Sequence, residues 1–233
     1  MENIFLKYNC SIEEKLKNFE KYINRQSLSR FIARYELFKM IKEIKGSIIE
    51  CGVHHGGGLM AWAKLSSALE PYAIHRQVIG FDTFEGFPEI GENDIGQYSN
   101  NNLYEGGFKL NYNVYDELTE LIDIYNDNRF LNEFQKIKLI KGNACEKIPE
   151  FISNNPHLIV SLMFLDFDLY EPTKVALENF IPRIPKGGII AFDEINNQYW
   201  PGETQALLEK ININKFSLRK FDFDPNISFI VIE

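Results

Sequence analysis

Cysteine is scarce in this chain of 233 residues, which has three, at Cys10, Cys51 and Cys145, and no Cys-x-x-Cys pair. An odd number of widely spaced cysteines argues against a disulfide framework. No apolar run approaches 18 residues, and the beginning of the chain has no apolar stretch of signal-peptide length. We therefore expect a cytoplasmic protein without a membrane segment.

Basic residues are also in the minority, with 25 Lys and Arg against 33 Asp and Glu, and a net charge of −8. Because nucleic-acid affinity comes mainly from neutralising phosphates, this balance argues against a nucleic-acid binder. Charges of both signs are mixed along the chain, so no patch for a membrane surface is expected. The remaining composition, 45% hydrophobic and 25% charged, is that of an ordinary globular core. We expect one α/β domain over residues 1–233.

The first part of the chain is predicted to be a helical arm over residues 1–46. Apolar residues recur at helical spacing between residues 11 and 45, with a predicted break near residues 25–29. The arm is expected to pack either on its own sheet or on a second subunit, so a homodimer is one of two expected arrangements.

Beyond the arm, apolar runs of strand length alternate with helical stretches. The predicted strands are residues 47–53, 77–84, 136–143, 161–168 and 187–194, and the predicted helices are 58–69, 145–153, 172–180 and 202–210. Two final strands near 215–223 and 227–233 are expected to form a hairpin. This order predicts a Rossmann-like, doubly wound α/β sheet of about seven strands, mostly parallel with an antiparallel C-terminal hairpin. Ligands bind such sheets at the carboxyl ends of the strands.

Residues 85–113 interrupt the alternation, because they are rich in Asn, Gly and Tyr and poor in aliphatic side chains. They follow the end of a predicted strand and so lie on the expected binding side. A long loop there is typical of a lid or a binding loop. A mobile loop without function is the alternative.

The first glycine-rich turn, SIIECGVHHGGG at residues 47–58, lacks the Gly-x-Gly-x-x-Gly pattern, and the chain contains no P-loop motif. Those motifs bind anionic phosphates. An acid at Glu50 instead suits a cationic ligand, and S-adenosylmethionine carries an ammonium and a sulfonium but no phosphate. Gly52, Gly56 and Gly57 would let the backbone approach it closely. A capped turn with a chance acid is the alternative interpretation.

Two further polar residues follow predicted strands. Asp82, in GFDTF, is placed to accept hydrogen bonds from the two hydroxyls of a ribose. That ribose is common to NAD and S-adenosylmethionine, so Asp82 indicates an adenosine without choosing the cofactor. Asn143, in KGNACEKIP, is either a contact to the adenine edge or a plain turn residue.

Four acids follow the fourth and fifth predicted strands: Asp166 and Asp168 in LDFDLY, and Asp193 and Glu194 in AFDE. In a regular strand, the side chains of Asp166 and Asp168 share a face. Carboxylates at adjacent strand tips repel one another unless a cation lies between them, and all-oxygen donors suit Mg²⁺, Mn²⁺ or Ca²⁺. Capping of the following helices is the alternative role.

His54 and His55 are adjacent and, on extended backbone, point in opposite directions. Two consecutive histidines rarely chelate one ion. Either could act as a base or contact a substrate.

Together these motifs resemble those of class I methyltransferases. IIECGVHHGGG, GFDTFEGFP, the LDFDLY to AFDE block and WPGETQAL are similar to the macrocin O-methyltransferase family over residues 27–210. Members of that family methylate sugar hydroxyls of antibiotics, and relatives serve surface polysaccharides. The resemblance implies S-adenosylmethionine as donor and Mg²⁺, or Mn²⁺, held by Asp166, Asp193 and Glu194. The chain departs from the family where Asp-Asp becomes Asp193-Glu194 and where Trp-Arg becomes His54-His55.

The resemblance also implies a division of roles, with a sugar-containing small molecule as the acceptor. Asp166 or His55 would be the base. The expected cofactor contacts are Glu50, Gly52, Val53, Gly56, Gly57, Asp82, Thr83, Asn143 and Asp166. The expected acceptor pocket contains the lid with His54, Asp168, Tyr170, Tyr199 and Trp200, and a place in the core is the alternative for the three aromatic residues.

Three other functions remain open at this stage. A nicotinamide-dependent sugar oxidoreductase would share Asp82 but would need phosphate-binding glycines and a Tyr-x-x-x-Lys or comparable base, and we identify neither in the sequence. A metal-dependent hydrolase could use the acid cluster alone. A non-catalytic protein could bind S-adenosylmethionine without turning it over.

Overall fold

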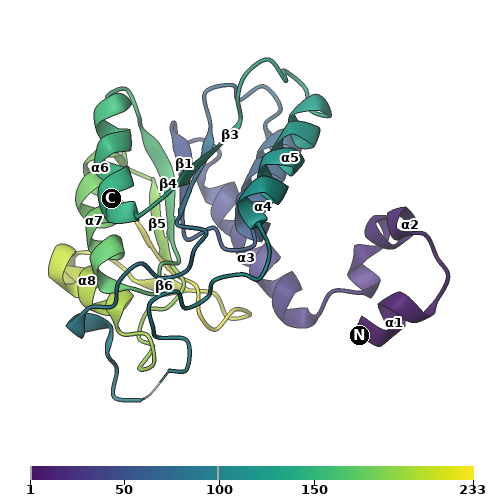
Figure 1. The fold of residues 1–233 in the computed structure, drawn as a ribbon. Coiled ribbons are helices and arrows are strands. Elements are labelled where there is room, and N and C mark those ends of the chain that lie inside the picture. Colours follow the sequence, from purple (N-terminus) through teal and green to yellow (C-terminus); the bar gives the residue numbers. More distant parts are fainter. Residues whose placement is uncertain (1, 99) are drawn as a thin grey trace.

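The computed structural model describes residues 2–98 and 100–233, and is built on one seven-stranded sheet in the order β3-β2-β1-β4-β5-β7-β6 (Figure 1). β1 to β5 are parallel, whereas β7 runs antiparallel to both β5 and β6. The strands are β1 (Ser47–Cys51), β2 (Val78–Asp82), β3 (Ile137–Lys141), β4 (Val160–Leu165), β5 (Ile189–Phe192), β6 (Arg219–Lys220) and β7 (Ser228–Val231). The predicted Rossmann-like sheet with a C-terminal hairpin is confirmed, and its strand order reverses between β1 and β4.

Helices cover both faces of this sheet. One face carries α3 (Arg25–Ile41), α4 (Gly57–Leu69) and α5 (Val114–Asp127), and the other carries α6 (Ala144–Asn154), α7 (Tyr170–Phe180) and α8 (Gly202–Lys210) (Figure 1). Each face has its own buried apolar cluster. In β1, for example, Ile48 packs toward α3 and α4 and Ile49 toward α7. Because side chains alternate along a strand, Glu50 falls on the same face as Ile48.

The arm differs in detail from the sequence prediction. It contains α1 (Glu2–Lys7), α2 (Ile12–Lys17) and the short 3-10 helix η1 (Phe19–Lys21). The helix break predicted near residues 25–29 lies earlier, because the Asn24 side chain accepts a hydrogen bond of 2.7 Å from the Ser27 N–H and so caps α3. α3 then runs without interruption to Ile41.

Two other differences concern the middle of the chain. α5 was not predicted, although the Asn113 side chain caps its first turn and its apolar residues Val114, Leu118 and Ile122 are buried at helical spacing. Every predicted strand is longer than the observed one, and each of β1 to β5 ends early because the residues that follow it, such as Gly52, Asp166 and Asp193, leave the ladder to form turns. Among residues 85–98 and 100–113, the one regular element is a short 3-10 helix, η2 (Glu92–Asp94).

No helix in the two described stretches of the chain is long and apolar enough to cross a membrane.

Candidate active site

A cavity of about 270 Å³ opens at the carboxyl ends of the strands. Its volume is close to the lower end of the roughly 300–1,000 Å³ typical of small-molecule sites. Ten of the residues predicted from the sequence line it: Gly52, His54, Asp82, Thr83, Asn143, Asp166, Asp168, Asp193, Glu194 and Trp200. Seven others do not line it: Glu50, Val53, His55, Gly56, Gly57, Tyr170 and Tyr199.

The floor of the cavity depends on a close approach between the tips of β1 and β4. The Asp166 N–H donates to the Cys51 carbonyl at 2.8 Å. Gly52 has a φ of +90°, and a Cβ built on it would lie 2.0 Å from the Asp166 carbonyl oxygen. Only glycine fits here, because both the backbone conformation and the space exclude a side chain.

Asp82 organises the first turn from the neighbouring strand. Its Oδ2 accepts hydrogen bonds from the Val53 and His54 N–H groups, both at 2.8 Å, and its Oδ1 accepts one of 2.7 Å from the Phe84 N–H. A carboxylate offers about four acceptor positions, so three are already used. Asp82 therefore has room for one further hydrogen bond, whereas the sequence interpretation assigned it two ribose hydroxyls.

Glu50 lies behind the cavity wall, where it is 1% exposed. Burial raises the pKa of Glu50 to about 8, although the charge of Arg34 on α3 opposes the shift. In the part of the chain that the structure covers, Glu50 Oε2 and Trp62 Nε1 are both buried without a hydrogen-bond partner. The Glu50 carboxylate therefore lies beneath the glycine-rich turn and does not line the cavity.

The acids after β4 and β5 converge on the cavity, but not as continued strands. β4 ends at Leu165, and Asp168 has a φ of +62°, which few residues other than glycine adopt. The expectation that Asp166 and Asp168 share one face of a strand is therefore wrong, because neither residue belongs to the strand. They reach the same cavity because the backbone turns sharply between them.

Glu203, in the first turn of α8, is a fifth acid at this site, and the sequence analysis did not assign it a role. It is fully buried, and its two carboxylate oxygens accept hydrogen bonds of 3.1 Å from the N–H groups of Phe167 and Glu194. The carboxylate thus links the loop after β4 to the end of β5. The signal was its place in the WPGETQAL motif.

Burial and mutual repulsion raise the pKa values of these acids. Burial, followed by the charges of Asp193, Asp168 and Glu203, raises the pKa of Asp166 well above its usual range. Burial and the charges of Glu194 and Asp193 raise the pKa of Asp168 to about 8. Burial raises the pKa of Glu203 and of Glu194 as well. The cavity therefore holds carboxyl groups that keep protons toward neutral pH.

Arg30 of α3 supplies a positive charge to this cluster. Its Nη1 lies 2.5 Å from Asp193 Oδ1, and its Nε lies 3.6 Å from Asp224 Oδ2 in the turn between β6 and β7. Asp224 is in turn fixed, since its Oδ1 accepts hydrogen bonds from the Asn226 and Ile227 N–H groups. Sequence reasoning missed Arg30 because it lies more than 130 residues from the acids it contacts.

Within residues 2–98 and 100–233, the structure contains no group of three or more His, Cys, Asp or Glu side chains that are arranged to hold a metal ion. The chemistry of the donors nevertheless fits a hard divalent cation. Asp166, Asp193 and Glu194 offer only oxygen atoms, line one cavity and are subject to mutual repulsion that a cation would relieve.

The two histidines lie differently from the prediction. His54 has a φ of +48°, so the backbone is not extended, and the two imidazole rings meet edge to face with centroids 4.3 Å apart. His54 lines the cavity, and burial and the nearby His55 lower the pKa of His54. His55 Nδ1 instead lies 2.7 Å from the Tyr112 hydroxyl, outside the cavity lining.

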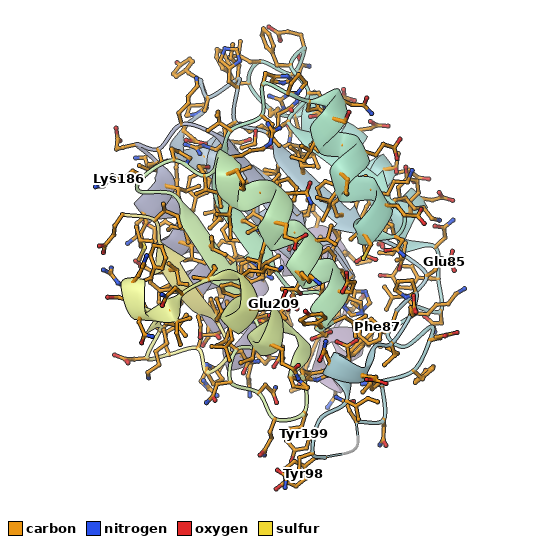
Figure 2. The ribbon with its side chains drawn as sticks, turned by 90° about the vertical axis from the view of Figure 1, so that its left-hand side faces the viewer. Glu85, Phe87, Tyr98, Lys186, Tyr199 and Glu209 are labelled. Atoms are coloured by element: carbon orange, nitrogen blue, oxygen red, sulfur yellow. The ribbon has the colours of Figure 1, made fainter. Side chains whose placement is uncertain are left out.

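Three aromatic rings cover the cavity. Phe87 and Phe108 come from residues 85–113, and Trp200 comes from the loop before α8. Their ring centroids are 5.4 to 5.8 Å apart in every pair. Tyr199 points away from this group and pairs with Tyr98 at 5.4 Å, as Figure 2 shows at the edge of the molecule.

Residues 85–113 are tied down at their base and near their middle. At the base, the Phe87 N–H donates to the Gly107 carbonyl at 3.0 Å, and the Gly106 N–H donates to the Phe87 carbonyl at 2.8 Å. Near the middle, the buried Asp94 accepts hydrogen bonds from the Gly91 N–H at 2.8 Å and from the Tyr170 N–H at 2.6 Å. Asp94 thereby fastens the loop to the beginning of α7.

The statement that the sequence offers no Tyr-x-x-x-Lys pair is wrong, because Tyr170 and Lys174 have this spacing, which some nicotinamide-dependent oxidoreductases use as a base. The Tyr170 hydroxyl donates to Glu209 on α8, and Lys174 lies 5.3 Å from the Tyr170 ring centroid. Neither residue lines the cavity. This pair therefore has no access to a ligand bound there.

Asn143 has a structural role that the sequence left open. Its side chain accepts a hydrogen bond of 3.0 Å from the Cys145 N–H and so caps α6. It also lines the cavity together with Ala144. The capping role and a contact to a ligand are compatible.

The comparisons with known proteins agree with this geometry. The solved structure described as CalS11, calicheamicin methyltransferase, aligns with 99% of this chain and 89% of its own at a TM-score of 0.93 and 30% identity. A second structure of CalS11, described as a TDP-rhamnose 3'-O-methyltransferase without ligand, aligns with 99% of this chain and 90% of its own at a TM-score of 0.84 and 28% identity. The O-methyltransferase NovP, at 18% identity, covers 88% of this chain and 79% of its own, with a TM-score of 0.62, and shares the fold.

A curated relative from Streptomyces olivaceus is 8-demethyl-8-(2,3-dimethoxy-alpha-L-rhamnosyl)-tetracenomycin-C 4'-O-methyltransferase. It is 27% identical over 151 residues, which cover 65% of this chain and 53% of that protein, so the match spans about half the length of the relative. The family profile described as macrocin-O-methyltransferase (TylF) matches residues 23–212. That match takes in α3, the sheet from β1 to β5 and every residue that lines the cavity. The chain belongs to the macrocin O-methyltransferase family.

Proposed function

We propose that this protein transfers the methyl group of S-adenosylmethionine to a hydroxyl of a sugar. The observation that carries the proposal is the cavity at the sheet edge, where Gly52 and Asp82 lie beside the acids Asp166 and Asp193. One half of that cavity suits an adenosine with a cationic tail, and the other suits a hydroxyl that must lose a proton.

The donor half consists of the β1 turn and the tip of β2. The remaining acceptor position on Asp82 would take a ribose hydroxyl, and the backbone at Gly52 and His54, which line the cavity, would lie along the methionine part. Glu50 would act from behind the turn: burial keeps its carboxyl protonated up to about pH 8 in the free protein, and a cationic donor bound in front of the turn would favour the ionised form. Asn143 and Ala144 lie where the adenine would extend.

The acceptor half consists of the acids and the aromatic cover. Asp166 would accept the proton of the sugar hydroxyl in its ionised form, which a bound cation would favour by opposing the burial and the acidic neighbours that raise the pKa of Asp166. The oxygen then bonds to the methyl carbon, the carbon–sulfur bond breaks, and its electron pair goes to sulfur. Because the reaction neutralises the positive sulfonium, a dry cavity favours it. Phe87, Phe108 and Trp200 would exclude water.

A divalent cation, Mg²⁺ or Mn²⁺, is part of the proposal. Asp166, Asp193 and Glu194 would hold it, and when bound it would supply a positive charge that lowers the pKa of a nearby hydroxyl. Arg30 would keep Asp193 directed into the cavity.

The acceptor that we propose is a deoxyhexose of the rhamnose type, attached to a nucleotide or to a natural product. CalS11 is described as acting on TDP-rhamnose, and the Streptomyces olivaceus relative methylates a rhamnosyl group. Both descriptions share the sugar but differ in what it is attached to. His54 and the 85–113 loop, which border the acceptor half, are the expected determinants of that difference.

The test has two parts. Calorimetric titration should show binding of S-adenosylmethionine and no binding of NADH, and Asp82→Asn should weaken the former. Incubation with methyl-labelled donor and rhamnose in free, nucleotide-bound and glycosidic forms should then give a labelled sugar ether with one of them. Binding of NADH in place of S-adenosylmethionine would contradict the proposal, as would hydrolysis of an acceptor without any donor.

A further inference from the structure

The first turn of α8 contacts both loops that carry the acids of the candidate site. α8 packs beside α7 on one face of the sheet (Figure 1). The Glu203 carboxylate accepts hydrogen bonds from the N–H groups of Phe167, in the loop after β4, and of Glu194, in the loop after β5. The next side chain, that of Thr204, accepts one of 2.9 Å from the Asn196 N–H. One end of one helix therefore joins the two loops.

One backbone hydrogen bond to a neighbouring strand follows the end of β4, and one follows the end of β5. The Asp166 N–H donates to the Cys51 carbonyl at 2.8 Å, and the Asp193 N–H donates to the Leu165 carbonyl at 3.0 Å. The N–H group that comes next on each segment differs. Within residues 2–98 and 100–233, neither of these two groups donates to a backbone carbonyl. Each of them therefore needs an acceptor from elsewhere in the fold.

Glu203 supplies both of the missing acceptors. Its Oε1 accepts from the Phe167 N–H and its Oε2 accepts from the Glu194 N–H, each at 3.1 Å. The Glu203 side chain is fully buried, and a buried N–H group is costly to leave unpaired. A single carboxylate thus fixes the first peptide N–H after Asp166 and the first after Asp193.

Gly202, directly before Glu203, lets α8 come this close to the loop after β4. A Cβ built on Gly202 would lie 2.5 Å from the Tyr170 nitrogen and 2.8 Å from the Asp168 carbonyl oxygen. It would also lie 2.5 Å from Oδ1 of Asp94, the atom that accepts the hydrogen bond of the Tyr170 N–H. The position therefore has no space for a side chain, and the close approach of the helix is specific to glycine.

The acids of the proposed cation site depend on these two backbone segments for their direction. Asp166, Asp193 and Glu194 all lie within one residue of an N–H group that Glu203 binds. A displacement of either segment would move its carboxylates relative to those of the other. Mg²⁺ requires near-ideal octahedral geometry, with oxygen atoms at about 2.0–2.1 Å. A small change in the separation of the two segments should therefore weaken cation binding.

We propose that Glu203 is a positioning residue for methyl transfer. Its carboxylate holds the loops after β4 and β5 at the separation that Asp166, Asp193 and Glu194 need to bind a divalent cation. This role rests on the proposed function, because it concerns the same acids. Glu203 does not line the cavity, so it would touch neither the cation nor the acceptor. Replacement of a residue that orients metal ligands typically changes metal affinity or activity about 10–100-fold.

Two variants separate the position of this side chain from its charge. Glu203→Gln keeps the length but loses the charge and one of the two acceptor oxygens. Glu203→Asp keeps the charge and both oxygens, but its shorter side chain no longer reaches both N–H groups. Both variants should bind Mn²⁺ about 10–100-fold more weakly than the wild type. An aspartate variant with wild-type affinity would show that the charge alone matters, and would overturn the proposal.

Calorimetric titration measures this effect apart from catalysis, with Mn²⁺ and with S-adenosylmethionine on the full chain. Affinity for the donor should stay nearly unchanged, because Asp82 holds the β1 turn through its own hydrogen bonds. Leu177→Ala is the control for lost stability, since Leu177 is fully buried on α7 and does not line the cavity. That control should keep the Mn²⁺ affinity of the wild type. An equal loss of Mn²⁺ affinity in the control would overturn the positioning role.

Hydrogen exchange gives a second measurement that needs neither Mn²⁺ nor an acceptor. Residues 166–169 and 193–196 should both exchange faster in the two Glu203 variants than in the wild type, and unchanged exchange would overturn the proposal. A wild type that binds no Mn²⁺ would overturn it as well. A wild type that binds Mn²⁺ but methylates no sugar would contradict the proposed function alone, and the Mn²⁺ affinities of the variants would still decide the role of Glu203.

Discussion

The guanidinium of Arg30 lies 2.5 Å from the carboxylate of Asp193, although the two residues come from opposite ends of the chain. The contact joins α3 to the carboxyl end of β5, where the acid cluster begins. It gives one of the five acids a fixed direction while the others raise one another's pKa values. The packing of α3 against the sheet therefore places one positive charge, that of Arg30, beside the acid cluster.

Replacement of Asp193 tests the proposed metal site. Asp193→Asn should lower the rate of methyl transfer about 100-fold or more. Asp193 would help to hold the cation that stabilises the developing charge on the sugar oxygen, and loss of such stabilisation has effects of that size. Calorimetry should also show weaker binding of Mn²⁺. Asp222→Asn is the control, since the Asp222 side chain is fully exposed. Methyl transfer that persists in the variant and in the presence of a chelator would remove the metal from the mechanism.

Glu50→Gln should change how stability depends on pH. The folded protein keeps the Glu50 proton up to about pH 8, whereas the unfolded chain releases it near the ordinary pKa of 4.5. Since the folded state binds more protons in this window, Glu50 makes the wild type less stable as pH rises from about 4.5 to about 8.

The glutamine variant should lack that contribution. The unfolding free energy of the variant minus that of the wild type should therefore increase as the pH rises from about 4.5 to about 8. Each pKa unit corresponds to about 1.4 kcal/mol, which sets a total of a few kcal/mol at most. Urea denaturation at a series of pH values measures the difference, and the exposed Glu13→Gln should show none. Parallel curves for wild type and Glu50→Gln would contradict the buried, protonated state of Glu50.

Two glycines in the same turn should respond differently to alanine. Gly52→Ala places a methyl group 2.0 Å from the Asp166 carbonyl at a φ of +90°, so it should destabilise by more than about 1 kcal/mol and abolish donor binding. Gly57→Ala meets open space at the first position of α4 and should remain within about 0.5 kcal/mol of the wild type. Thermal unfolding and donor titration measure both. Equal tolerance of the two changes would disprove the close approach of β1 and β4.

Asp94→Asn tests whether residues 85–113 act as a lid. The asparagine loses a charge that accepts hydrogen bonds from the N–H groups of Gly91 and Tyr170. Bonds to a charged group contribute about 1.5–3 kcal/mol, so KM for the acceptor should rise at least about tenfold while donor affinity stays nearly unchanged. Steady-state kinetics measure KM for the acceptor and for the donor separately, with the exposed Glu92→Gln as control. An unchanged KM would mean that the fastening of this loop does not affect the acceptor.

Patterns in the sequence predicted the parallel part of the sheet because each of β1 to β5 is a mainly apolar run bounded by turns. They also predicted which residues meet at its carboxyl edge, since parallel strands end on the same side. Gly52, Asp82, Asp166 and Asp193 all line one cavity for that reason.

Long-range contacts were beyond such patterns. Arg30 meets Asp193 only once α3 has packed against the sheet, and Glu203 meets the strand tips only once α8 has docked. Local backbone conformation was equally hidden, because His54 and Asp168 adopt positive φ values, which are uncommon for residues other than glycine even though His and Asp adopt them more often than most. Glu50 was identified as special, but its burial behind the turn depends on Arg34 and Trp62, from two different helices.

The most direct test of the central claim is a parallel assay of wild type and Asp166→Asn with methyl-labelled S-adenosylmethionine and a nucleotide-activated or glycosidic rhamnose. The wild type should give a product that carries the label on a sugar oxygen. The variant should bind the donor yet react at least about 100-fold more slowly, because it lacks the proposed base. Failure of the wild type to label any sugar, or equal rates for the two proteins, would contradict the assignment of this cavity as a sugar O-methylation site.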